Sequence, residues 1–192
     1  MDGARMFYGG KDQSFMVWPV RGRGVVLPAT GQKQCYDAEG KEIPCLGSGQ
    51  DAEFHFGTPW PEPRFLPETE SIIDRVTGLR WLRNADLIGG ATTWPEALLA
   101  VKGLQHIAPD GIEWRLPNIN ELESLVDCAR HSPALPMGHV LIHLSEGYWS
   151  TTSSMYEPDW AWALYLDKGA IGVGQKSGRH FRVWPVADSL RS

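Results

Sequence analysis

The chain has 192 residues and a formal net charge of −5, with 42% hydrophobic and 21% charged residues. This composition is typical of a soluble globular domain, and an acidic balance does not favour binding to nucleic acid or to an anionic membrane. No apolar run approaches the roughly 18 residues that a membrane-spanning helix needs, so we expect no membrane insertion. Nine tryptophans, 21 glycines and 14 prolines predict short strands, many turns and large rigid side chains between them.

A six-residue pattern occurs twice. Residues 15–20 read FMVWPV and residues 181–186 read FRVWPV. A shared tryptophan and proline argue against chance recurrence, and internal repeats of this kind mark related modules. We therefore predict that residues 1–24 are the C-terminal strand remnant of a preceding similar module and that residues 25–192 form one complete domain. The alternative places both copies on neighbouring strands of a single domain.

Residues 27–31 read LPATG, which matches the signal that sortases cleave. A sorting signal lies at the end of a chain, before an apolar stretch and a basic tail, whereas most of this chain follows the match. We interpret Pro28 and Gly31 as turn residues instead.

The first half of the chain predicts strands and one helix. A strand is expected from Val25, then a loop between Cys35 and Cys45, then an extended proline-rich crossing at 57–65. Residues 71–82 predict a β-hairpin that turns at Thr77-Gly78, because apolar residues alternate on both sides. Residues 92–104 predict a helix with Thr93 as its N-cap, and Glu96, three residues later, completes a capping box.

The second half predicts another helix and a run of strands. Asn118 is the expected cap of a helix within residues 114–130, with an apolar stripe at Ile119, Leu122, Leu125, Val126 and Ala129. Cys128 lies near this stripe and is interpreted as a buried free thiol. Strands are expected at residues 148–154, 160–167, 169–176 and 180–186. A hairpin, two helices and an antiparallel meander predict an α+β fold.

Several of these segments, in this order, resemble the Lcl C-terminal-like domain, a bacterial module named for a collagen-like Legionella adhesin. The resemblance rests on TGQKQCYD…IPCLGSGQD, IIDRVTGLRWL, TWPEAL, WRLPNINELESLVD, SPALP, YWSTTSS and the final VWPV, and it covers residues 28–186. WRLPNINEL is also similar to a segment of formylglycine-generating enzymes, which implies a C-type-lectin-like fold with two helices on antiparallel sheets and long loops.

The resemblance implies an exported adhesion module, extracellular, at the cell surface or periplasmic, whose export signal is not in this chain. Family members bind partners that include sulfated glycans. A disulfide between Cys35 and Cys45 is then expected, with two free thiols as the alternative. The enzyme-like relatives need a pair of reactive cysteines in the C-terminal half, where only Cys128 lies, so we expect no enzymatic activity.

Candidate ligand-binding side chains lie on two loops near the C-terminus. The first loop combines aromatic faces with carboxylates, which is how proteins commonly hold sugars, and the second carries cations suited to an anionic partner. The candidates are Tyr156, Glu157, Asp159, Trp160, Lys168, Lys176, Arg179 and His180. Two readings compete with this one: Trp160 and Trp162 fill the core, and the cations belong to a solvated turn.

No cofactor or metal is expected. His139 and His143 have a metal-ligand spacing only if they are helical, and their segment reads as extended or looped. The leading hypothesis is a non-enzymatic recognition module that binds glycan or protein through its loops. The alternative is a structural module that mediates oligomer or protein–protein contacts without a small ligand.

Overall fold

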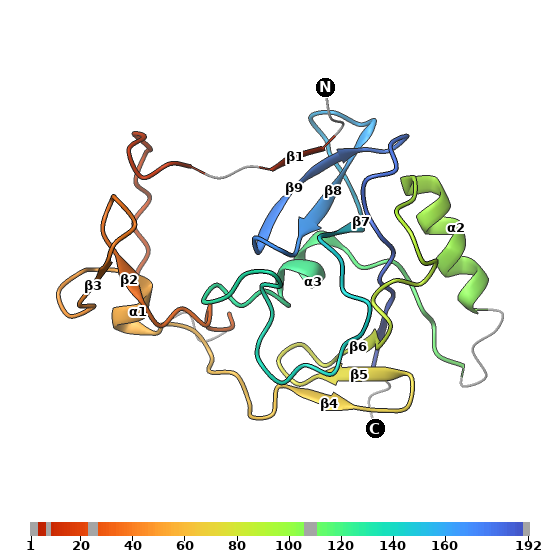
Figure 1. The fold of residues 1–192 in the computed structure, drawn as a ribbon, viewed down its shortest axis with the longest axis horizontal. Coiled ribbons are helices and arrows are strands. Elements are labelled where there is room, and N and C mark those ends of the chain that lie inside the picture. The colour runs from red at the N-terminus through yellow and green to blue at the C-terminus, as the bar shows by residue number, and fades with distance from the viewer. Residues whose placement is uncertain (1–3, 7–8, 23–26, 106–110, 190–192) are drawn as a thin grey trace.

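The computed structural model describes residues 4–6, 9–22, 27–105 and 111–189, and the strand expected at Val25 lies outside these residues (Figure 1). The described chain is a mixed α+β structure with three sheets of antiparallel strands and few helices. This outcome confirms the predicted α+β class.

The first sheet has the strand order β1-β9-β8-β7 and contains the first three strands of the predicted meander. Its strands are β1 (Ala4–Met6), β7 (Gly147–Ser153), β8 (Trp160–Tyr165) and β9 (Ala170–Gln175). The strand expected at 180–186 is wrong: this segment makes isolated bridges at Phe181 and Arg182 and becomes a strand only at Val186. Three residues of β1 pair with the outer edge of β9. Gly174 lies where a side chain would meet the Phe181 ring at 2.2 Å, so the sheet can press closely against the segment that follows it.

The second sheet has the order β10-β6-β5-β4 and contains the predicted hairpin. Its strands are β4 (Phe65–Pro67), β5 (Ser71–Asp74), β6 (Leu79–Leu82) and β10 (Val186–Asp188). Ile72 pairs with Trp81 across the hairpin, and both side chains are buried. Gly78 has φ +72°, a left-handed conformation that favours glycine in the turn.

The third sheet is the two-stranded ribbon of β2 (Cys35–Tyr36) and β3 (Glu42–Ile43). A disulfide joins Cys35 to Cys45, whose Cα atoms lie 5.2 Å apart, as expected. The four-residue helix α1 (Asp51–Phe54) follows. Figure 1 shows this ribbon and α1 to one side of the two larger sheets.

Helix α2 (Trp94–Gln105) begins at the expected capping box. The Thr93 amide donates to the Glu96 carboxylate at 3.0 Å, and the Glu96 amide lies 3.4 Å from the Thr93 hydroxyl. Ala97 and Val101 face the core, and the cap agrees with the prediction.

Helix α3 (Ile119–Glu123) is shorter than predicted. Asn118 caps the helix as expected and forms a capping box with Glu121, but the helix ends where later amides find tertiary partners. The amides of Asp127 and Cys128 donate to the carbonyls of Ala134 and Thr30. Cys128 is consequently exposed rather than buried, which corrects the prediction for this thiol.

Two buried clusters form the core, and the segment 181–186 belongs to both. Trp184 and Val186 pack in the cluster of the hairpin and α3, whereas Phe181 and Val183 pack in the cluster of α2 and the meander. The earlier copy of this pattern, at residues 15–20, lies in extended chain outside any helix or strand. The two copies therefore occupy opposite environments in the same chain.

Candidate functional site

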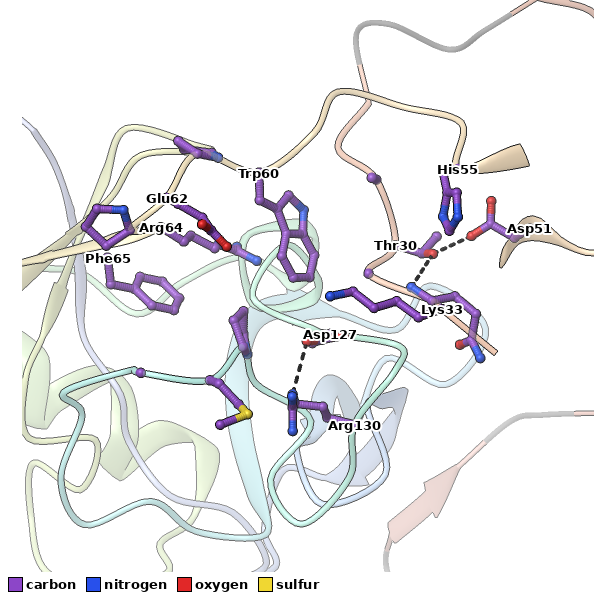
Figure 2. Close-up of a pocket in the computed structure, with 18 of the residues that line it drawn as sticks. Thr30, Lys33, Asp51, His55, Trp60, Glu62, Arg64, Phe65, Asp127 and Arg130 are labelled. Atoms are coloured by element: carbon purple, nitrogen blue, oxygen red, sulfur yellow. Dashed lines mark hydrogen bonds and ion pairs between the residues drawn. The ribbon is translucent and has the colours of Figure 1, made fainter. Parts of the chain in front are cut away.

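A cavity of about 620 Å³ lies between the disulfide-bearing region and the main body of the domain (Figure 2). Four segments line it: residues 29–33, α1 with the two residues after it, residues 60–65, and part of 127–138. Its volume is within the range of small-molecule sites in proteins. The cavity has a mixed aromatic and charged lining, and the sequence did not point to it.

Backbone hydrogen bonds hold the first wall, residues 29–33, in place. The Ala29 amide donates to the Thr58 carbonyl, and the Cys128 amide donates to the Thr30 carbonyl, both at 2.9 Å. At Gly31, φ is +83° and a Cβ would lie 2.4 Å from Asp127 Oδ1 and 2.7 Å from the Trp60 ring. Gly31, the glycine of LPATG, is thus a turn residue, and it lies where the backbone of this wall passes close to Asp127 and Trp60.

Arg64 forms the floor of the cavity, and its side chain is only 4% exposed. Its Nε and Nη2 atoms donate to the two oxygens of Asp74, both at 2.9 Å, and Nη2 also donates to the Ser124 carbonyl. The guanidinium carbon lies 4.7 Å from the Trp60 ring centroid and 5.1 Å from that of Phe65. This bidentate ion pair and the two aromatic rings fix the guanidinium in one orientation.

Two buried donors at this cavity have no hydrogen-bond partner among the described residues: Arg64 Nη1 and Trp60 Nε1. Buried donors are almost always paired in folded proteins, and leaving one unpaired costs about 1–3 kcal/mol. Figure 2 shows the Arg64 guanidinium and the Lys33 ammonium directed into the space beside the Trp60 ring. The cavity therefore offers hydrogen-bond donors and positive charge next to an aromatic face.

Carboxylates line the same cavity. Asp127 is buried; its Oδ1 accepts from the Ala129 amide at 2.9 Å, and its Oδ2 lies 3.6 Å from Arg130 Nε. Asp51 accepts a hydrogen bond from the Thr30 hydroxyl. Partial burial, followed by the negative charge of Asp127, raises the pKa of the neighbouring Cys128 thiol. The lining thus combines acceptors with the donors of Lys33, Arg64 and Arg130.

The two loops predicted to bind ligand lie side by side at one end of β8 and β9, where Trp160 pairs with Gln175. Lys176 joins them: its ammonium donates to Ser153 Oγ and to the Pro158 carbonyl and lies 4.4 Å from the Trp94 ring centroid. The structure therefore brings the two loops together, with their central cation already engaged within the protein.

The other predicted residues fall into different environments. Arg179 forms an ion pair with Glu96 at 2.5 Å, and Trp160 is buried. Lys168 lies in the turn at the opposite end of the β8–β9 hairpin. Tyr156 is 92% exposed, and Glu157, Asp159 and His180 lie on or next to the loops that Lys176 joins.

His139 and His143 do not share one site. His143 Nδ1 lies 3.1 Å from Asn84 Oδ1, whereas His139 Nδ1 is buried without a partner among the described residues. Burial lowers the pKa of His139. No group of three or more His, Cys, Asp or Glu side chains in the described part of the chain could hold a metal ion.

Sequence reasoning missed Trp60 and Arg64 because residues 57–65 were interpreted only as a proline-rich crossing. The available signal was an aromatic residue and a cation four positions apart in a segment too rich in proline to form a helix. Arg64 pairs with Asp74 on the following hairpin, and Asp127, which lines the same cavity, is distant in sequence, so only the fold brings these groups together.

An α+β domain with a loop-built cavity is the class that this fold and site define. A family model described as the Lcl C-terminal domain matches residues 70–187. The chain therefore belongs to the Lcl C-terminal domain family. Residues 28–69, including the cysteine loop, lie outside the match, so the family core supplies the wall at 127–138 and the preceding region supplies the others. No curated protein and no solved structure matches the chain.

Family membership and the Cys35–Cys45 disulfide both point to an extracellular or secreted protein, because disulfides persist in oxidising compartments. Among the described helices, none has the length and apolar content that crossing a membrane requires.

Proposed function

We propose that this chain is a non-enzymatic recognition module of an exported bacterial protein, and that it binds an acidic glycan in the cavity between Trp60 and Arg64. The observation that carries the proposal is the pair of unpartnered buried donors, Arg64 Nη1 and Trp60 Nε1, at the cavity wall. A carboxylate or sulfate on a sugar would accept hydrogen bonds from both donors and would bring a negative charge next to Lys33 and Arg130.

The rest of the lining suits a sugar ring. The Trp60 ring offers an apolar face for stacking, and the carboxylates of Asp127 and Asp51 can accept hydrogen bonds from hydroxyl groups. The chain is acidic overall and the cavity lining carries three carboxylates and three cations, so the Lys33 ammonium and the donors beside Trp60, not a net positive field, would select the anionic group. A C-type-lectin-like arrangement of loops around antiparallel sheets is part of this proposal.

Isothermal titration calorimetry tests the proposal with three oligosaccharides of equal length: one with uronic acids, one with sulfates and one neutral. We expect the acidic probes to bind and the neutral probe to bind much more weakly. Lys33→Ala and Arg130→Ala should each weaken binding about fivefold, the value for an ionic contact worth about 1 kcal/mol. Lys102→Ala, an exposed lysine on α2, is the matched control and should leave binding unchanged.

The surface formed by residues 155–160 and 174–180 is the second candidate, because Tyr156 projects fully into solvent beside it. Tyr156→Ala and Arg179→Ala in the same titration distinguish the two sites. If only these two variants lose affinity, the ligand binds at this surface and the cavity proposal fails.

An assembly module without a small ligand is the alternative function. Sedimentation at increasing protein concentration distinguishes it, since self-association without glycan, together with the absence of binding to all three probes, would favour assembly.

A further inference from the structure

The two copies of the FxVWPV pattern differ completely in exposure. Trp184 is 0% exposed, whereas Trp18 is 92% exposed, and Met16, Val17 and Val20 are exposed to a similar degree. A run of large apolar side chains in contact with water is unusual in a folded protein and marks an interaction surface. Residues 15–20 are therefore a candidate contact surface.

The later copy shows what such a segment does when it is covered. Trp184 lies between the rings of Trp81 and Tyr148, with centroids 5.1 and 5.0 Å away, and its Nε1–H donates to the Leu82 carbonyl at 2.9 Å. The segment belongs to both core clusters and leads into β10.

Backbone groups of the later copy are also paired. The carbonyls of Val183 and Pro185 accept from the amides of Leu87 and Leu82, and Val186 exchanges two hydrogen bonds with Arg115. By contrast, none of the described residues makes a backbone hydrogen bond to residues 15–20. The earlier copy thus has the side chains and the free backbone of a closing segment, without a core to close.

One position distinguishes the two copies: Met16 stands where the later copy has Arg182. Arg182 forms an ion pair with Asp86, whose side chain is 11% exposed. Asp86 Oδ1 also accepts from the amides of Gly89 and Gly90. A methionine in this position would leave Asp86 Oδ2, which pairs with Arg182, without a cation. Leaving a largely buried carboxylate unpaired strongly destabilises the folded state.

We propose that residues 15–20 are the closing core segment of a second domain of the same family, one with a neutral side chain at the position equivalent to Asp86. A second copy of this chain is disfavoured as the partner. Its own segment 181–186 already fills the groove, and its Asp86 selects arginine over methionine. The methionine therefore sets which domain the segment enters.

The first experiment places the FMVWPV sequence in this domain. Arg182→Met in the full chain should lower the thermal midpoint, and adding Asp86→Asn should restore most of the loss, because asparagine keeps the acceptor for Gly89 and Gly90 without the charge. If the double variant is no more stable than Arg182→Met alone, FMVWPV does not close a neutral groove and the proposal is overturned.

The second experiment tests docking directly. The acceptor is the full chain with three substitutions. Trp184→Ala weakens the packing of its own residues 181–186, and Asp86→Asn removes the negative charge from the groove. Trp18→Ala prevents its own residues 15–20 from competing with the peptide. A labelled peptide of residues 9–22 should bind this acceptor and raise its thermal midpoint. The same peptide with Trp18→Ala is the control and should do neither.

A second acceptor, which retains Asp86, tests specificity. We expect the peptide to bind it at least about tenfold more weakly than the Asp86→Asn acceptor, because binding would leave a buried charge unpaired. If an acceptor is unfolded alone, the readout is recovery of a cooperative unfolding transition when the peptide is added. Equal effects of the two peptides would overturn the docking proposal. Equal binding of the peptide to the acceptors with and without Asp86→Asn would overturn the choice of a distinct partner domain in favour of a second copy.

Discussion

The two tryptophans of the repeated pattern make a matched pair for testing the account of the core. Trp184→Ala removes a fully buried indole that packs between two aromatic rings and donates a hydrogen bond to the Leu82 carbonyl. Truncation of a buried tryptophan to alanine costs about 3–5 kcal/mol. Loss of the hydrogen bond to the carbonyl of half-buried Leu82 adds to this cost.

Trp18→Ala makes the same chemical change in the same sequence context, but at a side chain that is 92% exposed. Such a surface substitution should change the free energy of unfolding by less than about 0.5 kcal/mol. For a chain of this size, a loss of 3–5 kcal/mol lowers the thermal midpoint by roughly 6–20 °C. Urea denaturation and thermal unfolding of both variants, measured in parallel, give the comparison.

Two outcomes would refute the reasoning. If Trp184→Ala lost less than about 1 kcal/mol, the segment 181–186 would not close the core as described. If Trp18→Ala were as destabilising as Trp184→Ala, residues 15–20 would be packed within this domain, and their exposure would be wrong.

Three further predictions concern other parts of the chain. Native protein kept from reductant should be alkylated at Cys128 alone, and more slowly at pH 8 than a free cysteine because the raised pKa of this thiol leaves less thiolate; alkylation of all three cysteines would contradict the disulfide. Hydrogen bonds from Thr92 and Thr93 lower the pKa of Glu96 from 4.5 to about 2, so its stabilising contribution is present above pH 4.5 and is lost as the pH falls toward 2. The stability gap between wild type and Glu96→Gln in urea should therefore narrow over that range, and a constant gap would contradict the cap. Deletion of residues 1–21 should leave the thermal midpoint within a few degrees, since this region contributes only the short β1 and exposed hydrogen bonds from Lys11 to the Tyr36 and Asp37 carbonyls among its described contacts; loss of cooperative unfolding would show that these residues are integral to the domain.

Local patterns in the sequence were sufficient for the elements that local chemistry determines. The hairpin at 71–82 follows from alternation around Thr77-Gly78, and the start of α2 follows from Thr93 and Glu96, because the groups that form each feature lie within a few residues. The α+β class follows from the order of these elements.

Tertiary contacts decided the features that the sequence did not reveal. Helix α3 ends early because the amides of Asp127 and Cys128 donate hydrogen bonds to the carbonyls of Ala134 and Thr30 instead of to helix carbonyls. No periodicity in residues 114–130 records those partners, so the expected continuation to Ala129 and the expected burial of Cys128 were wrong for the same reason.

The candidate site illustrates the same limit. Trp60 and Arg64 are close in sequence, but the groups that make them a site, Asp74, Asp127 and Lys33, come from segments that meet only in the fold. By contrast, the loops chosen from the sequence do meet, yet Lys176 is held by Ser153 and Pro158 there. Residue types alone could not show which cations are already paired.

Binding of an acidic oligosaccharide to the full chain, compared among wild type, Lys33→Ala and Lys102→Ala, tests the central proposal most directly. Recognition in the cavity predicts that the acidic probe binds wild type and Lys102→Ala equally, that Lys33→Ala weakens binding about fivefold, and that added salt reduces the difference. Equal affinity of all three proteins for the acidic probe, or equal affinity of wild type for the acidic and neutral probes, would contradict it.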